Sequence, residues 1–495
     1  MMYQSTRDPS HKKYSAAEVI KMGLAPDGGL FIPESVPTLS PEEITALCAD
    51  TYPVRAAKIL SKFLSDYTYE ELLSDCTAAY AESSFPGGAA PLVSIRDHIY
   101  SLELWHGPTA AFKDMALQIM PRLLSRALDK TGETHDALIL VATSGDTGKA
   151  ALEGYKDIAR IKIMVFYPVD GVSRVQKLQM ATQTGDNVNV CAIRGNFDDA
   201  QTGVKKIFGD ASMADALEKR GYVLSSANSI NWGRLAPQIV YYVSAYCDLL
   251  TKGVIQMGET MDVCVPTGNF GNIFAGYIAK LMGLPIRHFV CASNQNNILT
   301  DFLRTGTYDR NRTFHLTMSP SMDILISSNL ERLLCLSAGE ERTAAYMEAL
   351  KTKGAYTVEA DVLAKITENF SGYFADEAMT AATIRDYFYN SGYLADTHTA
   401  VALSCAEQYL AALSEENIRP IVVDSTASPY KFAADVYTSL RGIAPADPLG
   451  ALDDLAAATG TEIPYPLRGL GGRTVRFTDV MNADDMPEAV LNDCN

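Results

Sequence analysis

The stretch at residues 103–114 reads ELWHGPTAAFKD and carries one lysine, Lys113, at the end of a run of small and apolar residues. Beyond it, apolar residues recur at the three- and four-residue spacing of a helix that buries one face. An amine in such a setting is partly desolvated, which favours its neutral form and makes it a nucleophile toward an aldehyde. The alternative is that Lys113 extends from a helix start with its ammonium group in water. The first interpretation predicts a Schiff-base lysine.

The composition is that of an ordinary globular protein. A length of 495 residues allows about two to four domains. The net charge of -17 argues against nucleic acid or an anionic membrane as a partner. The nine cysteines include no Cys-x-x-Cys pair, which favours reduced thiols in the cytoplasm and no zinc site. The first residues lack the apolar core of a secretory signal, and no run approaches the roughly 18 apolar residues of a membrane helix.

Short apolar runs alternate with helical patterns from residue 99 onward, which predicts parallel strands covered by helices on both faces. The expected architecture is α/β with two open, mostly parallel sheets flanked by helices and an N-terminal extension. We expect an N-terminal domain at 1–90, a small α/β domain at 91–225 and a large α/β domain at 226–495 with a helical insertion around 295–400. The expected strands lie at 99–104, 137–141, 161–166, 188–193, 261–265, 286–291 and 420–423.

Two glycine-containing loops each follow a predicted strand and open a helix, the place where ligands bind in such sheets. Residues 265–272 read VPTGNFGN, and their backbone N–H groups together with the helix start suit a phosphate. An ordinary strand-to-helix turn is the alternative. Residues 142–149 read ATSGDTGK and almost match a nucleotide-binding P-loop. Because Thr143 replaces the first glycine and Ala150 the final hydroxyl residue, we reject the nucleotide interpretation.

Three further stretches gather polar side chains next to predicted strands or helices. Residues 225–234 read SSANSINWGR, in which Arg234 is suited to bidentate phosphate binding, while Asn231 suits a helix cap equally well. Residues 423–432 read VDSTASPYKF and place two adjacent hydroxyls at a strand end. Residues 395–400 read ADTHTA, in which His398 is expected near the pocket or satisfied at a helix start.

Several of these stretches resemble segments of threonine synthases of the microbial and fungal type. HGPTAAFKD, PTGNFGN and SANSINWGR carry the resemblance, together with GLAPDGGLFIPE at 23–34, and it spans most of residues 1–480. These are pyridoxal 5'-phosphate enzymes of fold type II, the tryptophan-synthase β fold. The chain departs from the family pattern at Ser428, where the family has His, and at Thr397, where it has Pro.

The resemblance implies a role for each motif. Lys113 would carry the pyridoxal phosphate and act as the catalytic residue. The cofactor phosphate would be held by Gly268, Asn269, Phe270, Gly271 and Asn272. Thr426 would face the pyridine nitrogen and leave it unprotonated, since a hydroxyl is neutral. The substrate carboxylate would bind Thr143, Ser144, Asp146 and Thr147, and the substrate phosphate would bind near Ser229, Asn231 and Arg234.

The activity implied is conversion of O-phospho-L-homoserine and water into L-threonine and phosphate by β,γ-replacement, in a cytoplasmic monomer or homodimer. Enzymes of the same fold remain as alternatives: a phosphothreonine or phosphoserine lyase, or a serine/threonine dehydratase. A pyridoxal-phosphate-binding protein without catalysis is the alternative from another class. The base that removes the β proton stays open.

Overall fold

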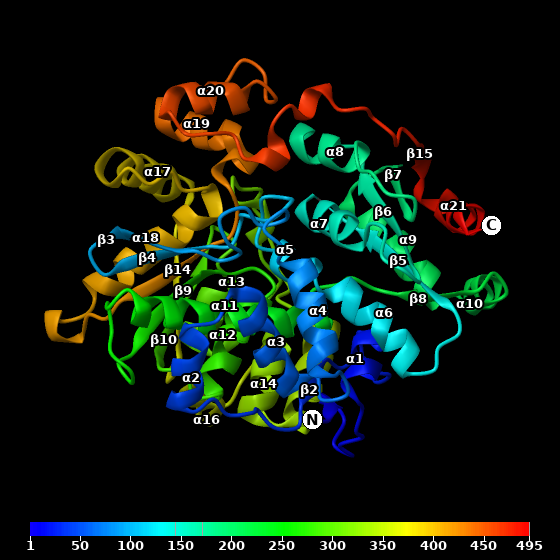
Figure 1. Ribbon diagram of the computed structural model, residues 1–495, viewed down its shortest axis with the longest axis horizontal. Helices are drawn as coiled ribbons and strands as arrows, with labels where there is room; N and C mark the ends of the chain where they lie inside the picture. Colours follow the sequence, from blue (N-terminus) through cyan, green and yellow to red (C-terminus); the bar gives the residue numbers. More distant parts are fainter. Residues whose placement is uncertain (144, 171, 495) are drawn as a thin grey trace.

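Two open sheets organise the chain in the computed structural model, which describes residues 1–143, 145–170 and 172–494 (Figure 1). The larger sheet has the strand order β13-β10-β9-β14-β4-β3 and is parallel except for its edge strand β3. Its central strands are buried along their whole length, as the apolar runs predict. The strands are β3 (Leu92–Arg96), β4 (Ile99–Glu103), β9 (Met261–Pro266), β10 (Ile286–Ser293), β13 (Phe370–Phe374) and β14 (Ile421–Ser425).

The smaller sheet has the order β15-β7-β6-β5-β8 and is parallel throughout. Successive residues of β5 point to opposite faces, and both faces are apolar: Leu138 packs in one core cluster and Ile139 in another. Helices therefore cover both sides. The strands are β5 (Asp136–Ala142), β6 (Ile161–Pro168), β7 (Val188–Arg194), β8 (Tyr222–Ser225) and β15 (Val480–Asn482).

The helices lie between and beside the strands of the two sheets (Figure 1). Around the smaller sheet lie α5 (Asp114–Leu117), α6 (Met120–Lys130), α7 (Asp146–Tyr155), α8 (Arg174–Ala181), α9 (Phe197–Gly209), α10 (Ala211–Glu218) and α21 (Met486–Asp493). With the larger sheet belong α11 (Trp232–Thr251), α12 (Gly271–Leu281), α13 (Ile298–Thr305), α14 (Leu330–Ala338), α15 (Glu340–Lys353), α16 (Ala360–Thr367), α17 (Glu377–Ser391), α18 (Thr397–Ala411), α19 (Ala433–Arg441) and α20 (Ala451–Thr459).

The N-terminal segment packs on α11, the most deeply buried long helix of the described chain. The ring of Tyr3 lies 5.5 Å from that of Trp232 at the start of α11, and the ring of Phe63 lies 5.9 Å from the same indole. Its elements are β1 (Tyr3–Ser5), α1 (Ala16–Met22), β2 (Phe31–Pro33), α2 (Pro41–Cys48), α3 (Tyr52–Phe63) and α4 (Tyr69–Ala79). No helix among the described residues has the length and apolar character needed to cross a membrane.

The expected α/β architecture is confirmed, but strand pairing departs from the domain boundaries expected from the sequence. Strands β3 and β4 lie between 91 and 225, yet they belong to the larger sheet. Strand β15, near the C-terminus, pairs with β7 of the smaller sheet. The expected insertion at 295–400 also contributes β13 to the larger sheet, and it forms a small antiparallel sheet of two strands, β11 (Thr307–Asp309) and β12 (Ala355–Thr357). Such pairings join residues far apart in the chain, so local patterns do not reveal them.

Candidate active site

The position of Lys113 follows from a short antiparallel contact at the end of two neighbouring strands. Strands β4 and β14 are parallel, so their carboxyl ends leave the larger sheet at the same edge. There the N–H of Phe112 donates to the carbonyl of Thr426 at 2.8 Å, and the N–H of Ser428 donates to the carbonyl of Ala110 at 3.0 Å. The backbone segments that carry Lys113 and Thr426 are therefore brought side by side.

The side chain of Lys113 is largely buried, with 13% of it exposed. Its ammonium nitrogen Nζ lies 3.5 Å from the hydroxyl of Ser321 and 3.9 Å from the carboxylate of Asp146. Burial lowers the pKa of Lys113, and the positive charges of Arg234 and Lys431 lower it further, while Asp146 partly opposes them. The surroundings therefore favour the neutral, nucleophilic amine.

Asp146 begins helix α7 and lies between two lysines. Its oxygen Oδ1 accepts from Nζ of Lys431 at 2.8 Å and from the amide of Gln176 at 2.9 Å. Burial acts to raise the pKa of Asp146, but Lys431 and Lys113 outweigh it and hold that pKa well below its usual range. The carboxylate is thus ionised beside the amine of Lys113.

The other residues of the 142–149 loop differ in their hydrogen bonding. The hydroxyl of Thr143 accepts from the N–H groups of Gly145 and Gly148, both at 3.0 Å, and holds the turn. The hydroxyl of Thr147 has no hydrogen-bond partner among the described residues, while Ser144 lies outside them. Lys149 pairs with Glu153 at 3.0 Å within α7, so it does not serve as the lysine of a P-loop.

The glycine loop between β9 and α12 presents unpaired donors. The backbone N–H groups from Gly268 to Gly271 have no acceptor in the described part of the chain. Phe270 has left-handed backbone geometry, φ 62°, which turns the loop into the helix. A Cβ on Gly268 would lie 2.8 Å from the carbonyl oxygen of Ser321, so a side chain there would displace the facing segment. Buried Asn272 accepts a hydrogen bond from Tyr242, while its own amide nitrogen has no partner among the described atoms.

Arg234, in the first turn of α11, is a buried guanidinium with no carboxylate partner among the described residues. Its Nη1 donates to the carbonyl of Ala227 at 2.8 Å, and its Nε is buried without a partner. Burial lowers the pKa of Arg234 to about 10. Burying a cation without a counter-ion is costly, and a guanidinium has the geometry to bind an anion through paired N–H groups.

The two neighbours predicted to share a phosphate with Arg234 differ from each other. The side chain of Asn231 accepts from the N–H of Gly233 at 2.8 Å and donates to the carbonyl of Ile20 at 2.9 Å, so it caps α11 and ties it to α1. Both of its polar ends are thus occupied by the fold. Ser229 is half-buried, and its hydroxyl has no partner among the described residues.

His398 reaches the site through a segment that sequence reasoning missed. Its Nε2 accepts from the N–H of Ser321 at 3.1 Å, so its Nδ1 carries the proton and donates to Asp396 at 3.0 Å. Ser321 belongs to the short 3-10 helix η1 (Pro320–Met322) and contacts Lys113 as well. Of the two departures from the family pattern, Thr397 lies buried in the first turn of α18 and Ser428 caps the 3-10 helix η3 (Pro429–Phe432).

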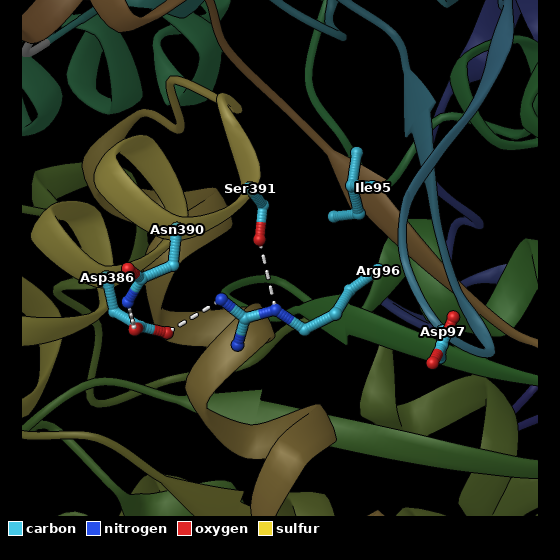
Figure 2. Close-up of a pocket in the computed structure, with 6 residues that line it drawn as sticks. All are labelled: Ile95, Arg96, Asp97, Asp386, Asn390 and Ser391. Atoms are coloured by element: carbon cyan, nitrogen blue, oxygen red, sulfur yellow. Dashed lines mark hydrogen bonds and ion pairs between the residues drawn. The ribbon is translucent and has the colours of Figure 1, made fainter.

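A hollow on the surface has a different character. Figure 2 shows Arg96 beside Asp386, Asn390 and Ser391. These residues line a cavity of about 520 Å³. The guanidinium donates to Ser391 at 3.1 Å and to Asp386 at 2.8 Å, and it also reaches Glu407 at 2.5 Å. Its hydrogen-bonding capacity is used by the protein itself, so this hollow is not the candidate site.

The comparisons with known proteins agree with this geometry. Residues 2–80 match the family model "Threonine synthase N terminus", and residues 87–424 match "Pyridoxal-phosphate dependent enzyme". The threonine synthase of Pseudomonas aeruginosa is 38% identical, over 92% of this chain and 93% of the relative. The crystal structure of pyridoxal-phosphate-bound threonine synthase from Brucella melitensis has a TM-score of 0.89 and 36% identity, covering 100% of both chains.

Human threonine synthase-like 1 is 40% identical over 86% of this chain, and the chain spans only 58% of that relative's length.

Pyridoxal phosphate fits the residues present. The unpaired N–H groups of the glycine loop, the orphaned amide of Asn272 and the partly desolvated amine of Lys113 are the donors and nucleophile that its phosphate and aldehyde require.

Proposed function

The chain belongs to the threonine synthase family of pyridoxal-phosphate-dependent enzymes, and from this premise we propose that it converts O-phospho-L-homoserine and water into L-threonine and phosphate. The observation that carries the proposal is the guanidinium of Arg234, which is buried close to Lys113 and has no carboxylate partner among the described residues. A phosphate group on the substrate supplies the missing negative charge. A serine/threonine dehydratase acts on a free hydroxy amino acid and would leave this cation unpaired.

Each part of the site has a task in this reaction. When bound, pyridoxal phosphate supplies an aldehyde for amines and a ring that delocalises negative charge developing on the substrate carbons. The N–H groups of Gly268 to Gly271 would hold the cofactor phosphate, and the hydroxyl of Thr426 would serve the pyridine nitrogen. The freed amine of Lys113 takes the proton from the α carbon and later returns it there.

The substrate is held at its two anionic ends. The start of α7, with the free hydroxyl of Thr147, receives the carboxylate, since a helix N-terminus favours negative charge. Arg234 and the hydroxyl of Ser229 receive the phosphate that departs. Because phosphate leaves before water adds, the site has to exclude water during the first half of the reaction. The segment around Ser321, which contacts both Lys113 and the glycine loop, is placed to do so.

The experiment that tests the proposal supplies O-phospho-L-homoserine, O-phospho-L-threonine and L-threonine separately to the protein loaded with pyridoxal phosphate. We expect phosphate release and L-threonine, identified by mass, from phosphohomoserine alone. A 2-oxo acid from phosphothreonine, without threonine from phosphohomoserine, would instead assign a phospho-amino-acid lyase. A 2-oxo acid from free L-threonine would assign a dehydratase.

We also propose that the protein is a cytoplasmic monomer or homodimer. All nine cysteines are free thiols, and eight of them are buried, which suits a reducing compartment. Light scattering coupled to gel filtration tests the oligomeric state. Cell fractionation tests the compartment, and recovery with a membrane or secreted fraction would overturn that part.

A further inference from the structure

A second buried lysine, Lys431, lies beside the active-site lysine with no task in the reaction described above. Its side chain is fully buried in η3, and its Nζ lies 2.8 Å from Oδ1 of Asp146. It also donates to the amide oxygen of Gln179 at 3.0 Å. Lys113 lies 3.9 Å from the other oxygen of the same carboxylate, Oδ2. One carboxylate is therefore shared unequally by two lysines.

The sharing is unequal because the partners of Asp146 are fixed by the fold. Oδ1 accepts from both Lys431 and the amide of Gln176, at 2.8 and 2.9 Å. Lys113 remains beyond hydrogen-bonding distance of Oδ2 and instead contacts the neutral hydroxyl of Ser321. The negative charge of Asp146 is thus compensated chiefly by Lys431.

The remaining charged groups near Lys113 do not replace that counter-charge. Arg234, on α11, is a second cation. Asp114, on α5, is the second acid that acts on Lys113, and burial raises its pKa to about 7. Both oxygens of Asp114 accept hydrogen bonds from Thr109, at 2.7 and 2.8 Å, so it is held away from the lysine. The amine of Lys113 therefore meets two cations and one carboxylate that is already paired.

We propose that Lys431 is a positioning residue that neutralises Asp146 and so leaves the amine of Lys113 uncharged and reactive. If Lys431 were absent, Asp146 would serve as the counter-ion of Lys113 and would hold a proton on it. If Asp146 were absent, Lys431 and Arg234 would both repel a charge on Lys113. The inference concerns the free amine, and it does not depend on which substrate the enzyme takes.

The test measures the titration of Lys113 in the full-length protein after pyridoxal phosphate has been removed with hydroxylamine. Trace labelling with acetic anhydride between pH 6 and pH 11, followed by peptide mass spectrometry, gives the pH at which Lys113 is half-reactive. For Lys431→Met we expect this midpoint about one pH unit above that of the unmodified protein. For Asp146→Asn we expect it about one pH unit below. The double variant Asp146→Asn/Lys431→Met should lie close to the unmodified protein.

The matched control is Lys149→Met. Lys149 is also a buried lysine next to a carboxylate, but its partner is Glu153 on its own helix, α7. We expect its substitution to leave the Lys113 midpoint in place. Circular dichroism reports whether each variant folds. If Lys431→Met does not fold, Asp146→Asn is compared with the double variant instead. The Lys113 midpoint of the double variant should then lie about one pH unit above that of Asp146→Asn.

Equal midpoints for Lys431→Met and the unmodified protein would overturn the proposal, as would an equal shift in Lys149→Met. The visible absorption band of the protein loaded with pyridoxal phosphate provides a second readout, and its pH dependence should shift in the same order among the variants. Neither measurement uses phosphohomoserine. A failure of the proposed enzymatic activity is therefore distinguishable from a failure of this inference.

Discussion

Two arginines show how differently this protein treats the same side chain in two places. Arg96, in the surface hollow, has two carboxylates and a hydroxyl as partners. Burial acts to lower its pKa, but Asp386, with Tyr387 and Glu407, outweighs burial and raises it. Arg234, near Lys113, has one backbone carbonyl, and burial lowers its pKa to about 10. The hollow opens on the surface, yet the charge of Arg96 is already paired with two carboxylates.

The difference teaches that buried charged and polar groups without partners mark the functional site better than a surface cavity does. The region of Lys113 combines a guanidinium without a carboxylate, a row of N–H groups without acceptors and an amide nitrogen without a partner in the described chain. Such groups destabilise a fold unless a ligand completes them. Around Arg96 the protein completes its own interactions.

The largest effect should come from removing the side-chain amine of Lys113. Lys113→Ala should abolish the visible absorption band of the bound cofactor and lower phosphate release from phosphohomoserine by about 10⁴-fold, because the amine that supplies the nucleophile is removed. Absorption spectra and a phosphate assay measure both. Lys149→Met, the buried lysine paired with Glu153, should keep the band. A band that survives in Lys113→Ala would assign the cofactor linkage to another residue.

The second effect separates the two arginines directly. Arg234→Met should lower kcat/KM for phosphohomoserine by about 10³-fold, because a buried charged contact with the leaving phosphate is lost. It should not destabilise the protein without ligand, since an uncompensated buried charge is removed. Steady-state kinetics and urea unfolding measure the two quantities. Inorganic phosphate should inhibit the unmodified enzyme and not the variant, and equal inhibition of both would place the phosphate elsewhere.

The third prediction concerns how the free energy of unfolding depends on pH. One carboxyl in each of the two regions contributes to it, and the two contributions have opposite signs. Asp424, in β14, accepts a hydrogen bond from Tyr242, which also contacts Asn272 after the glycine loop. Burial raises the pKa of Asp424 to about 7. The folded protein then retains a proton that the unfolded chain has lost, so the free energy of unfolding falls as pH rises from about 4 to about 7. The side chain of Asn resembles the protonated acid, so Asp424→Asn should remove this pH dependence. The fall in the free energy of unfolding that it removes is on the order of 3 kcal/mol. Urea unfolding at pH 5 and pH 8 measures it.

Asp386, beside Arg96, provides the control of opposite sign. The hydrogen bond from Arg96 holds the pKa of Asp386 below its usual value. Its contribution to stability is therefore present above its ordinary pKa and is lost as pH falls through the lowered value. Asp386→Asn should leave the slope between pH 5 and pH 8 unchanged. An unchanged slope in Asp424→Asn would mean that Asp424 is ionised in the folded protein.

Sequence reasoning placed the residues whose position follows from local pattern. Lys113 and Thr426 each follow an apolar strand, and parallel neighbouring strands end at one edge, so their meeting is predictable once the sheet is. The glycine loop follows β9 and opens α12 as expected. Its unpaired N–H groups agree with the phosphate role that we propose for it.

What the sequence could not supply depends on contacts between distant segments. Lys431 was visible in the 423–432 stretch, but its pairing with Asp146 joins the two sheets' regions and leaves no local pattern. Ser321 lies in a segment without clear periodicity. Asn231 fitted both a phosphate ligand and a helix cap, and only the bond to Ile20 shows that the fold uses both of its polar ends.

The smallest effect should come from the surface hollow, and it is the outcome that sharpens the comparison most. Arg96→Met removes ion pairs with Asp386 and Glu407, whose side chains are 43% and 41% exposed. Exposed pairs contribute about 0–1 kcal/mol each, and stacking of the guanidinium on Tyr387 adds about as much. We expect the free energy of unfolding to fall by about 1 kcal/mol and kcat/KM to stay unchanged. A tenfold loss of kcat/KM would show that a surface arginine with ion-pair partners also governs the reaction. Buried polar groups without partners would then no longer distinguish the site from the rest of the protein.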